Sequence, residues 1–388
     1  MVSSGSSSQV PARLGVRTVL VHDYLNQYGG AERLLEVLHD LSPEAPVFTS
    51  IYDPDSMPPF YRNWDIRTTW VERVPGVHQH HQRALAAFPV AFERMRLPDC
   101  DLVLSSSSAF AKMVRPPNGA VHVCYCHSPM RFAWNLDAYV ERERLPRAVG
   151  MALRPLMAAF RQRDRATAGR VDRFIANSSV VRDRIRAYWQ RDATVINPPV
   201  EVGMFRPVPA EDVQDYYLMV SRLVPYKRFD LAIEACNALK LPLWIVGDGR
   251  DRAALEAMAG PTVRFLGRVS DAELRDLYAR CRASIFMSED DFGIAQVESQ
   301  AAGRPVIALA AGGAVDTVVD GVTGIHVRQQ SVESLIEAFE RFERTTFDTE
   351  RLVTHAQTFS RERFEREMLD LIDETMAAAH AGERRRWN

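Results

Sequence analysis

Short apolar runs alternate with amphipathic stretches along almost the whole chain, and this alternation limits the possible folds more than any other feature. Residues 17–22 form the first run, and four leucines within residues 31–41 share one face at helical spacing. Runs at 101–105 and 120–125 repeat the pattern and end in polar loops. Strands that alternate with helices favour parallel sheets covered on both faces. We therefore predict an α/β protein with two doubly wound, Rossmann-like units.

The composition is that of an ordinary globular protein. The 388 residues suit two domains, with 46% hydrophobic and 25% charged residues. A net charge of -2 gives no electrostatic basis for nucleic-acid binding. Five cysteines, mostly in apolar runs, favour reduced cytosolic thiols. Cys124 and Cys126 share one face of a predicted strand, which favours packing there over metal binding.

No segment has the pattern of a secretory signal or a membrane span. Residues 1–9 are rich in serine and lack a basic start and an apolar stretch. The longest apolar candidate, residues 148–160, is interrupted by an Arg-Pro pair. We therefore expect a cytoplasmic protein. Residues 141–173 carry nine arginines against four acids and, with residues 85–95, suit peripheral contact with the inner face of the plasma membrane; a solvated basic face is the alternative.

Two carboxylates, Asp290 and Glu298, lie eight positions apart around a Phe-Gly-Ile turn. An apolar run at 283–287 has the pattern of a buried strand, and helical composition follows the turn. The turn thus opens a helix, whose unpaired N–H groups and positive dipole end suit a diphosphate. Carboxylates accept hydrogen bonds from hydroxyls, so one can hold a sugar and the other a ribose. An exposed acidic loop before a surface helix is the alternative.

Two cations occupy a second strand-to-helix loop. The apolar run 216–220 leads into residues 221–228, which include Arg222 and Lys227, and an amphipathic helix follows. Arginine and lysine directed at a departing diphosphate would stabilise the transition state electrostatically. A merely solvated basic loop is the alternative. The pair lies in the same predicted sheet as Asp290, which favours a shared site.

The N-terminal half contributes three further candidates. Gly29 and Gly30 remove side chains where a helix begins, so the backbone can approach a ligand there; a tight connection is the alternative. His127 directly follows an apolar strand, at the edge where an open α/β sheet binds ligands. A structural histidine is the alternative at that position.

The order and spacing of these motifs resemble the retaining glycosyltransferases of family 4, which have the GT-B fold of two Rossmann-like domains facing across a cleft. Most of the resemblance lies in the C-terminal half, at 221–223 with Lys227, 246–249, 265–269, 290–298, 302–308, 312–313 and 320–324. In the N-terminal half, residues 29–33 and the His-Ser-Pro-Met-Arg-Phe-Ala-Trp-Asn segment at 127–135 resemble members that use GDP-mannose in bacterial surface-polysaccharide assembly.

The resemblance implies a role for each candidate. Arg222 and Lys227 would neutralise the departing diphosphate, while the base would lie near residues 266–269. Asp290 would contact sugar hydroxyls; the family has Glu there, so the reach is one methylene shorter. The predicted catalytic residues are His127, Arg222, Lys227 and Asp290. The predicted donor-binding residues are Gly29, Gly30, Arg222, Lys227, Gly267, Val269, Asp290, Phe292, Gly293, Ile294 and Glu298, the last on the ribose.

The resemblance also implies a division of the chain. We predict a disordered segment at 1–13, an acceptor-binding domain at 14–200 and a nucleotide-sugar-binding domain at 201–360. Residues 361–388 would form a helix that crosses back to the first domain, followed by a tail.

The predicted activity is retaining transfer of a hexose to a hydroxyl of a saccharide or lipid-linked saccharide, with mannose from GDP-mannose as the favoured donor. We find no pair of catalytic carboxylates flanking the sugar and no D-x-D motif at a strand end, so we expect no covalent intermediate, no metal and no further cofactor. A non-catalytic nucleotide-sugar-binding protein and a GT-B epimerase or phosphorylase are the alternatives.

Overall fold

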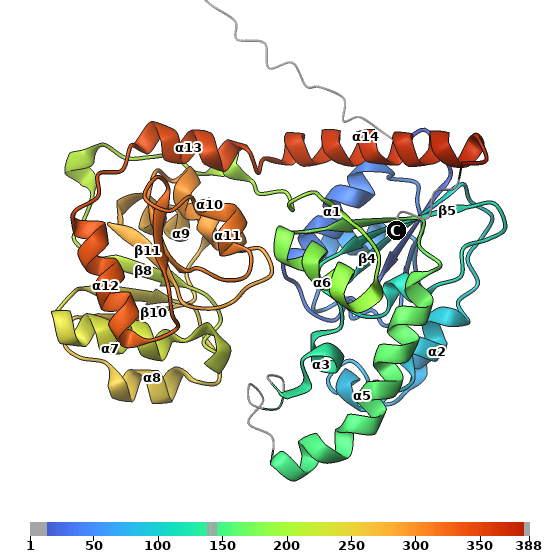
Figure 1. Cartoon of the computed structure of the whole chain (residues 1–388), viewed down its shortest axis with the longest axis horizontal. Helices are drawn as coiled ribbons and strands as arrows, with labels where there is room; N and C mark the ends of the chain where they lie inside the picture. The colour runs from blue at the N-terminus through green and yellow to red at the C-terminus, as the bar shows by residue number, and fades with distance from the viewer. Residues whose placement is uncertain (1–13, 138–139, 141–145, 384–388) are drawn as a thin grey trace, which may run out of the picture.

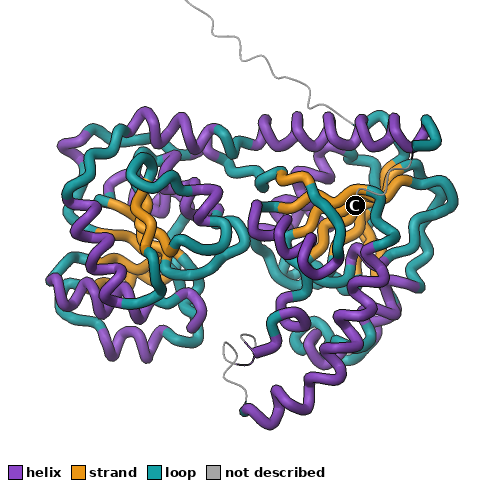
Figure 2. The backbone as a smooth tube through the Cα atoms, in the orientation of Figure 1, coloured by secondary structure: helices purple, strands orange, loops and turns teal. Residues whose placement is uncertain are grey.

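The computed structural model describes residues 14–137, 140 and 146–383, which form two α/β domains (Figures 1 and 2). The predicted disordered segment 1–13 and the last five residues of the predicted tail lie outside the described residues.

Each domain is built around one parallel sheet. The first sheet has the strand order β3-β2-β1-β4-β5-β6-β7, and the second has the order β10-β9-β8-β11-β12-β13. The strands of the first sheet are β1 (Thr18–His22), β2 (Val47–Thr49), β3 (Ile66–Thr68), β4 (Leu102–Ser107), β5 (Val121–Cys126), β6 (Arg173–Ala176) and β7 (Thr194–Val195). The strands of the second are β8 (Tyr217–Val220), β9 (Leu243–Val246), β10 (Val263–Gly267), β11 (Ala283–Phe286), β12 (Val306–Leu309) and β13 (Gly324–Val327). The doubly wound α/β prediction is confirmed.

Helices cover both faces of each sheet (Figure 1). Those of the first domain are α1 (Gly30–Leu41), α2 (Phe88–Glu93), α3 (Arg131–Trp134), α5 (Arg147–Ala168) and α6 (Ser179–Trp189). Those that follow are α7 (Phe229–Leu239), α8 (Arg252–Met258), α9 (Asp271–Arg280), α10 (Ile294–Ala301), α11 (Ala314–Thr317), α12 (Val332–Glu343), α13 (Thr349–Gln357) and α14 (Arg361–His380). Single 3₁₀ turns are η1 (Pro59–Asn63), η2 (Trp70–Arg73), η3 (His81–Ala84), η4 (Ala111–Met113), η5 (Val202–Met204), η6 (Ala210–Asp212) and η7 (Pro225–Lys227).

The continuous apolar pattern of β1 reflects its central place in the sheet. Side chains alternate between the two faces of a strand, so a strand covered on both sides needs an unbroken apolar run. Leu20 packs with the leucines of α1, whereas Val19 and Val21 pack on the opposite face with Phe88 and Phe92. The same central strand therefore belongs to both hydrophobic clusters of the first domain.

The C-terminal helix α14 packs on the first domain, although it follows the second domain in sequence (Figure 1). Its side chains Phe364, Met368 and Ile372 are buried in the same cluster as Leu20. Arg361 adds an ion pair of 2.6 Å with Asp40 of α1. This helix holds the second domain against the first.

Candidate active site

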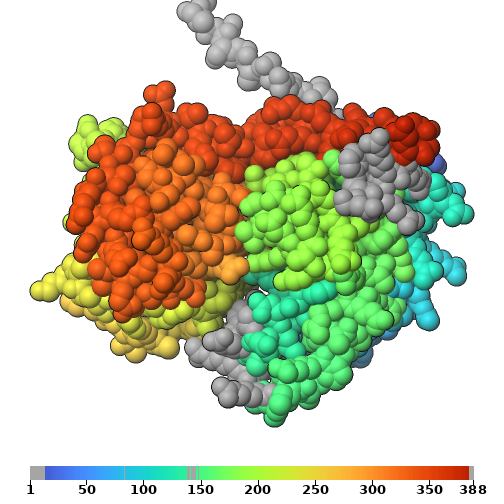
Figure 3. Space-filling model, viewed as in Figure 1, coloured from blue at the N-terminus to red at the C-terminus, as the bar shows by residue number. Residues whose placement is uncertain are grey.

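A cavity of about 430 Å³ lies where the carboxyl ends of the two sheets face each other. Parallel sheets leave an open crevice at this edge, because neighbouring crossovers turn in opposite directions from the central strands. Figure 3 shows the two domains in contact along the boundary between the orange and the green surfaces. The lining includes the predicted site residues Gly30, His127, Lys227, Asp290, Phe292, Gly293 and Ile294. The fold therefore brings seven candidates from both domains to one cavity.

Lys227 and Asp290 are bound to each other. Lys227 lies in η7, after β8, and its Nζ is 2.7 Å from Oδ1 and 2.8 Å from Oδ2 of Asp290. Ser288 donates a further hydrogen bond of 2.9 Å to Asp290. An ammonium group has three donors, so one N–H of Lys227 remains for another partner. The pair thus presents a cation held in one position beside the cavity.

Two helices begin at this cavity, one from each domain. The helix α10 starts after Gly293, whose φ of 100° is a left-handed conformation that suits glycine. The helix α1 starts at Gly30, where an added Cβ would lie 3.2 Å from the side chain of Ile294. Neither helix has a side-chain cap at its first turn. Both positive dipole ends are therefore available to an anion in the cavity.

Among the described residues, five predicted site residues do not line this cavity. They are Gly29, Arg222, Gly267, Val269 and Glu298. Arg222 is exposed on the loop after β8. Glu298 lies in α10, where burial raises the pKa of its carboxyl and the charge of Arg33 on α1 lowers it. The roles predicted for these five residues stay predictions.

His127 lies at the end of β5 and is half-buried. Its Nε2 is 2.8 Å from Oγ of Ser106, at the end of the neighbouring strand β4. Burial lowers the pKa of His127 to about 3. The imidazole is therefore neutral at physiological pH and can serve as a hydrogen-bonding group beside the cavity.

Sequence reasoning assigned no role to Arg131, which lines the cavity from α3. Arg131 forms an ion pair with Asp291, and Arg184 of α6 binds the same carboxylate at 2.5 Å. Arg184 also contacts Glu289 at 2.7 Å. Burial opposes the charge of Arg131, but the neighbouring carboxylates outweigh it and raise its pKa. The segment 127–135 contains Arg131, yet nothing in the sequence indicated its partner.

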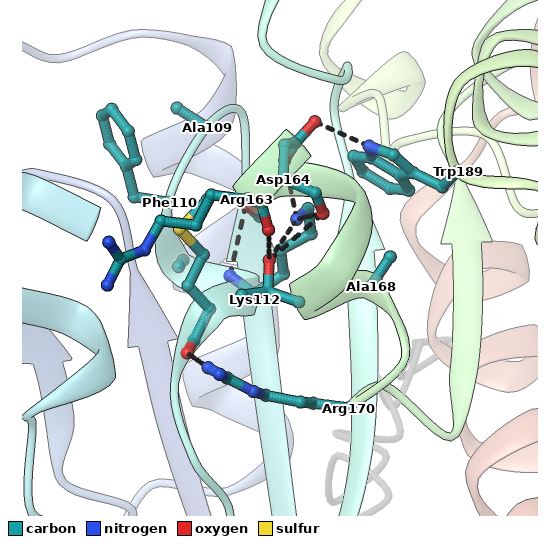
Figure 4. A network of polar contacts seen from close by, with 12 residues as sticks. Ala109, Phe110, Lys112, Arg163, Asp164, Ala168, Arg170 and Trp189 are labelled. Carbon is teal, nitrogen blue, oxygen red and sulfur yellow. Dashed lines mark hydrogen bonds and ion pairs between the residues drawn. The ribbon is translucent and has the colours of Figure 1, made fainter. Parts of the chain in front are cut away.

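A buried carboxylate, Asp164 of α5, contacts Trp189 and Lys112 (Figure 4) and also the last residue of α3. One of its oxygens accepts the indole N–H groups of Trp134 at 2.7 Å and Trp189 at 2.6 Å. Its other oxygen lies 2.7 Å from Nζ of Lys112, and neither charged side chain is exposed to solvent. Because Trp134 ends α3, this network fixes the helix that carries Arg131.

Two histidines of this sheet, the buried His122 and the half-buried His127, should make the fold sensitive to acid. Burial lowers the pKa of both His122 and His127 to about 3, whereas an unfolded histidine titrates at about 6.5. Between these values the unfolded state binds more protons, so the free energy of unfolding should fall as pH decreases from 6.5.

Urea unfolding at several pH values between 7.5 and 4.5 measures this slope. The variant His122→Gln should reduce it by up to about 1.4 kcal/mol per pH unit. The same replacement at the exposed His80 should leave it unchanged. If the free energy of unfolding changes equally with pH in His122→Gln and in the parent protein, the lowered pKa of His122 is contradicted.

The cysteines pack in the interior of the two domains. All five cysteines are buried and free, and Cys124 and Cys126 pack in one cluster, as predicted. In residues 14–137, 140 and 146–383, no three His, Cys, Asp or Glu side chains come together as a metal site. No helix in these ranges has the length and apolar character needed to cross a bilayer.

A crevice at the switch points of two Rossmann-like sheets, with two helix N-termini directed at it, is an architecture that binds nucleotide phosphates. The family Glycosyltransferase Family 4 matches residues 28–203, and the family Glycosyl transferases group 1 matches residues 204–359. The chain therefore belongs to the GT-B glycosyltransferases of this group, a family of sugar-transferring enzymes.

Individual relatives support the family and the fold. The chain is 28% identical over 228 residues to D-inositol 3-phosphate glycosyltransferase of Actinosynnema mirum, which covers 50% of this chain and 55% of that protein. It is 34% identical over 134 residues to glycogen synthase of Pseudomonas paraeruginosa, covering 32% and 26%. The chain thus spans about half or less of these curated relatives.

Among solved structures, HepE of Anabaena in complex with UDP superposes with a TM-score of 0.67 at 18% identity, over 92% of this chain and 100% of HepE. Sucrose-phosphate synthase of Thermosynechococcus elongatus also gives 0.67, at 17% identity, over 93% of this chain and all of that one. Both superpositions extend over the two domains, and they confirm the predicted GT-B fold.

Proposed function

We propose that this protein transfers a hexose from a nucleoside diphosphate sugar to a hydroxyl of a saccharide or lipid-linked saccharide, with retention of configuration. The observation that carries this proposal is that one cavity brings Lys227, His127 and the uncapped starts of α1 and α10 together. A departing diphosphate concentrates negative charge, and these groups supply positive charge and N–H donors for it. The sugar would lie on the His127 side of the cavity.

The chemistry assigned to this chain's own residues is electrostatic and positional. Lys227, held by Asp290, would neutralise the leaving diphosphate, and Asp290 would share hydrogen bonds with the sugar hydroxyls. Glu298 would hold the ribose, and Arg222 would approach the diphosphate from its exposed loop. The leaving phosphate itself would help remove the acceptor proton. We expect no protein nucleophile, no metal requirement and no further cofactor.

The acceptor has a candidate route next to the donor cavity. A second cavity of about 680 Å³ shares Arg131, Tyr226 and Phe229 with the first and is also lined by Trp134 and Tyr188. The rings of Trp134 and Tyr188 stack with centroids 4.4 Å apart. Flat aromatic surfaces with nearby polar groups suit a saccharide that reaches the donor from this side.

We also propose that α5 contacts the cytoplasmic face of a membrane. This helix extends away from the first sheet in Figure 1 and exposes Val149, Met151 and Leu156. Arg154 and Arg165 are exposed on the same helix. Apolar side chains beside arginines suit a surface of anionic lipids. Sedimentation with vesicles that contain phosphatidylglycerol, compared with pure phosphatidylcholine vesicles, measures this contact; equal sedimentation would contradict it.

The donor is best identified by a panel of nucleotide sugars. We expect GDP-mannose to raise the melting temperature and to release GDP slowly, and we include UDP-glucose because HepE has been solved with it. UDP-N-acetylglucosamine and UDP-galactose complete the panel, and each donor is tested with and without a chelator. Activity that survives chelation is the expected result.

The panel also separates the alternatives. Stabilisation by a donor without product in the presence of saccharide acceptors would favour a non-catalytic nucleotide-sugar-binding protein. Mass spectrometry of the products distinguishes transfer from an epimerase or phosphorylase reaction. No response to any donor would contradict the proposed function.

A further inference from the structure

Four side chains of the first domain form a continuous polar chain that ends at the donor cavity. Oε1 of Glu32 lies 3.4 Å from Nε2 of His22, and Nδ1 of His22 lies 3.1 Å from Oγ of Ser106. The same Oγ lies 2.8 Å from Nε2 of His127, which lines the cavity. Glu32, His22 and Ser106 are 4%, 3% and 1% exposed. The proposed donor chemistry uses only the last member of this chain.

The hydrogen atoms of this polar chain can be assigned one after another, starting from Glu32. A carboxylate only accepts hydrogen bonds, so Nε2 of His22, which faces Glu32, carries a hydrogen. A neutral imidazole carries one ring hydrogen, and the 3.4 Å contact with Glu32 places it on Nε2. Nδ1 of His22 then has a free lone pair. A hydroxyl has one hydrogen, which Ser106 gives to that lone pair, so its oxygen accepts from Nε2–H of His127.

We propose that Glu32, His22 and Ser106 are positioning residues that hold His127 as the Nε2–H tautomer and thereby direct an unprotonated Nδ1 at the cavity. The 2.8 Å contact with Ser106 uses Nε2 of His127, so Nδ1 is the ring nitrogen left for a ligand. Its ligand would be a hydroxyl hydrogen of the donor sugar, an inference that rests on the proposed function. Burial, which lowers the pKa of His127 to about 3, keeps a second proton off the ring.

The direction of the hydrogen bonds in this polar chain decides whether Nδ1 of His127 accepts or donates a hydrogen bond in the cavity. If His22 carried both hydrogens, Ser106 would accept from His22 and donate to Nε2 of His127. The hydrogen of His127 would then lie on Nδ1, and the cavity would receive a donor in place of an acceptor. The tautomer of His127 therefore depends on how many ring hydrogens His22 carries, although His22 does not line the cavity.

Long-range proton–nitrogen NMR of the full chain with labelled histidine tests this directly, without any ligand. The chain has ten histidines, and a His127→Gln spectrum identifies the signals of His127. We expect a protonated Nε2 and an unprotonated Nδ1 in the parent protein. The variant His22→Leu frees the hydrogen of Ser106 to bind Nε2 of His127, so the tautomer should change to Nδ1–H. Ser106→Ala should give a mixture of both.

The neighbouring residue Ser105 provides a matched control. Ser105 lies in the same strand and bonds Nε2 of another buried histidine, His122, at 2.8 Å. Ser105→Ala removes the same hydroxyl from the opposite face of the sheet, so it should change the signals of His122 and leave those of His127 as they are. An Nδ1–H tautomer in the parent protein, or an unchanged tautomer in His22→Leu, would overturn the proposal.

Calorimetric titration links the tautomer to the donor. His22→Leu should weaken binding of the nucleotide sugar found in the donor panel by about 3- to 10-fold, the range of one hydrogen bond. Binding of the free nucleoside diphosphate should stay unchanged, because His127 faces the sugar. Equal weakening of both ligands would show a merely structural role and overturn the proposal. A failure of every nucleotide sugar to bind contradicts the proposed function, whereas the tautomer in the ligand-free protein is read independently.

Discussion

The variant Lys227→Ala should lower the turnover number for sugar transfer by about 10²–10³-fold, the range found when one preorganised donor to a developing anion is removed. Two contacts with Asp290 hold the ammonium group of Lys227 in position at the cavity. The stabilisation of the diphosphate by Lys227 grows as the diphosphate departs. In Lys227→Ala, turnover should therefore fall more than donor affinity. Steady-state kinetics with the donor found in the panel measures both quantities.

Lys240→Ala is the matched control, because it removes the same side chain from an exposed position at the end of α7. It should leave turnover unchanged. Loss of Lys227 also leaves Asp290 without its cation, so the melting temperature of both variants must be compared. Unchanged turnover together with weaker donor binding in Lys227→Ala would show that the lysine acts in binding alone and would refute the electrostatic role.

The variant Asp164→Asn should destabilise the fold by about 3–5 kcal/mol, as expected when one member of a buried ion pair loses its charge. Lys112 would keep a positive charge with no exposed surface. In either orientation the new amide N–H group would face another donor, the indole N–H groups of Trp134 and Trp189 or the ammonium of Lys112. Urea unfolding followed by tryptophan fluorescence measures the loss close to the substitution.

Two further variants test the cause of this effect. Asp55→Asn breaks an ion pair with Arg62 in which both side chains are more than half exposed, and it should cost no more than about 1 kcal/mol. The double variant Lys112→Met/Asp164→Leu removes both buried charges and should recover most of the stability. If the single Asp164→Asn variant is as stable as Asp55→Asn, the network does not support α3 as described.

The fold was predictable because its signals are local. A parallel strand covered on both faces requires a continuous apolar run, and a covering helix requires apolar residues at helical spacing. Residues 17–22 and 31–41 show these two patterns, and they became β1 and α1. The turns at Gly30 and Gly293 were likewise readable, since each joins a strand pattern to a helix pattern. The sequence alone thus determined the two-domain α/β architecture and the loops that meet at the cavity.

The partners within the site were not predictable, because they join residues far apart in the chain. Only the packing of the two domains showed that Asp291 binds Arg131 and Arg184. Only the register of neighbouring parallel strands, with His22 beside Ser106, placed these two side chains in the same polar chain as His127. A sequence states which residues carry charge or hydrogen atoms, but the distance and burial that decide their chemistry arise from tertiary contacts.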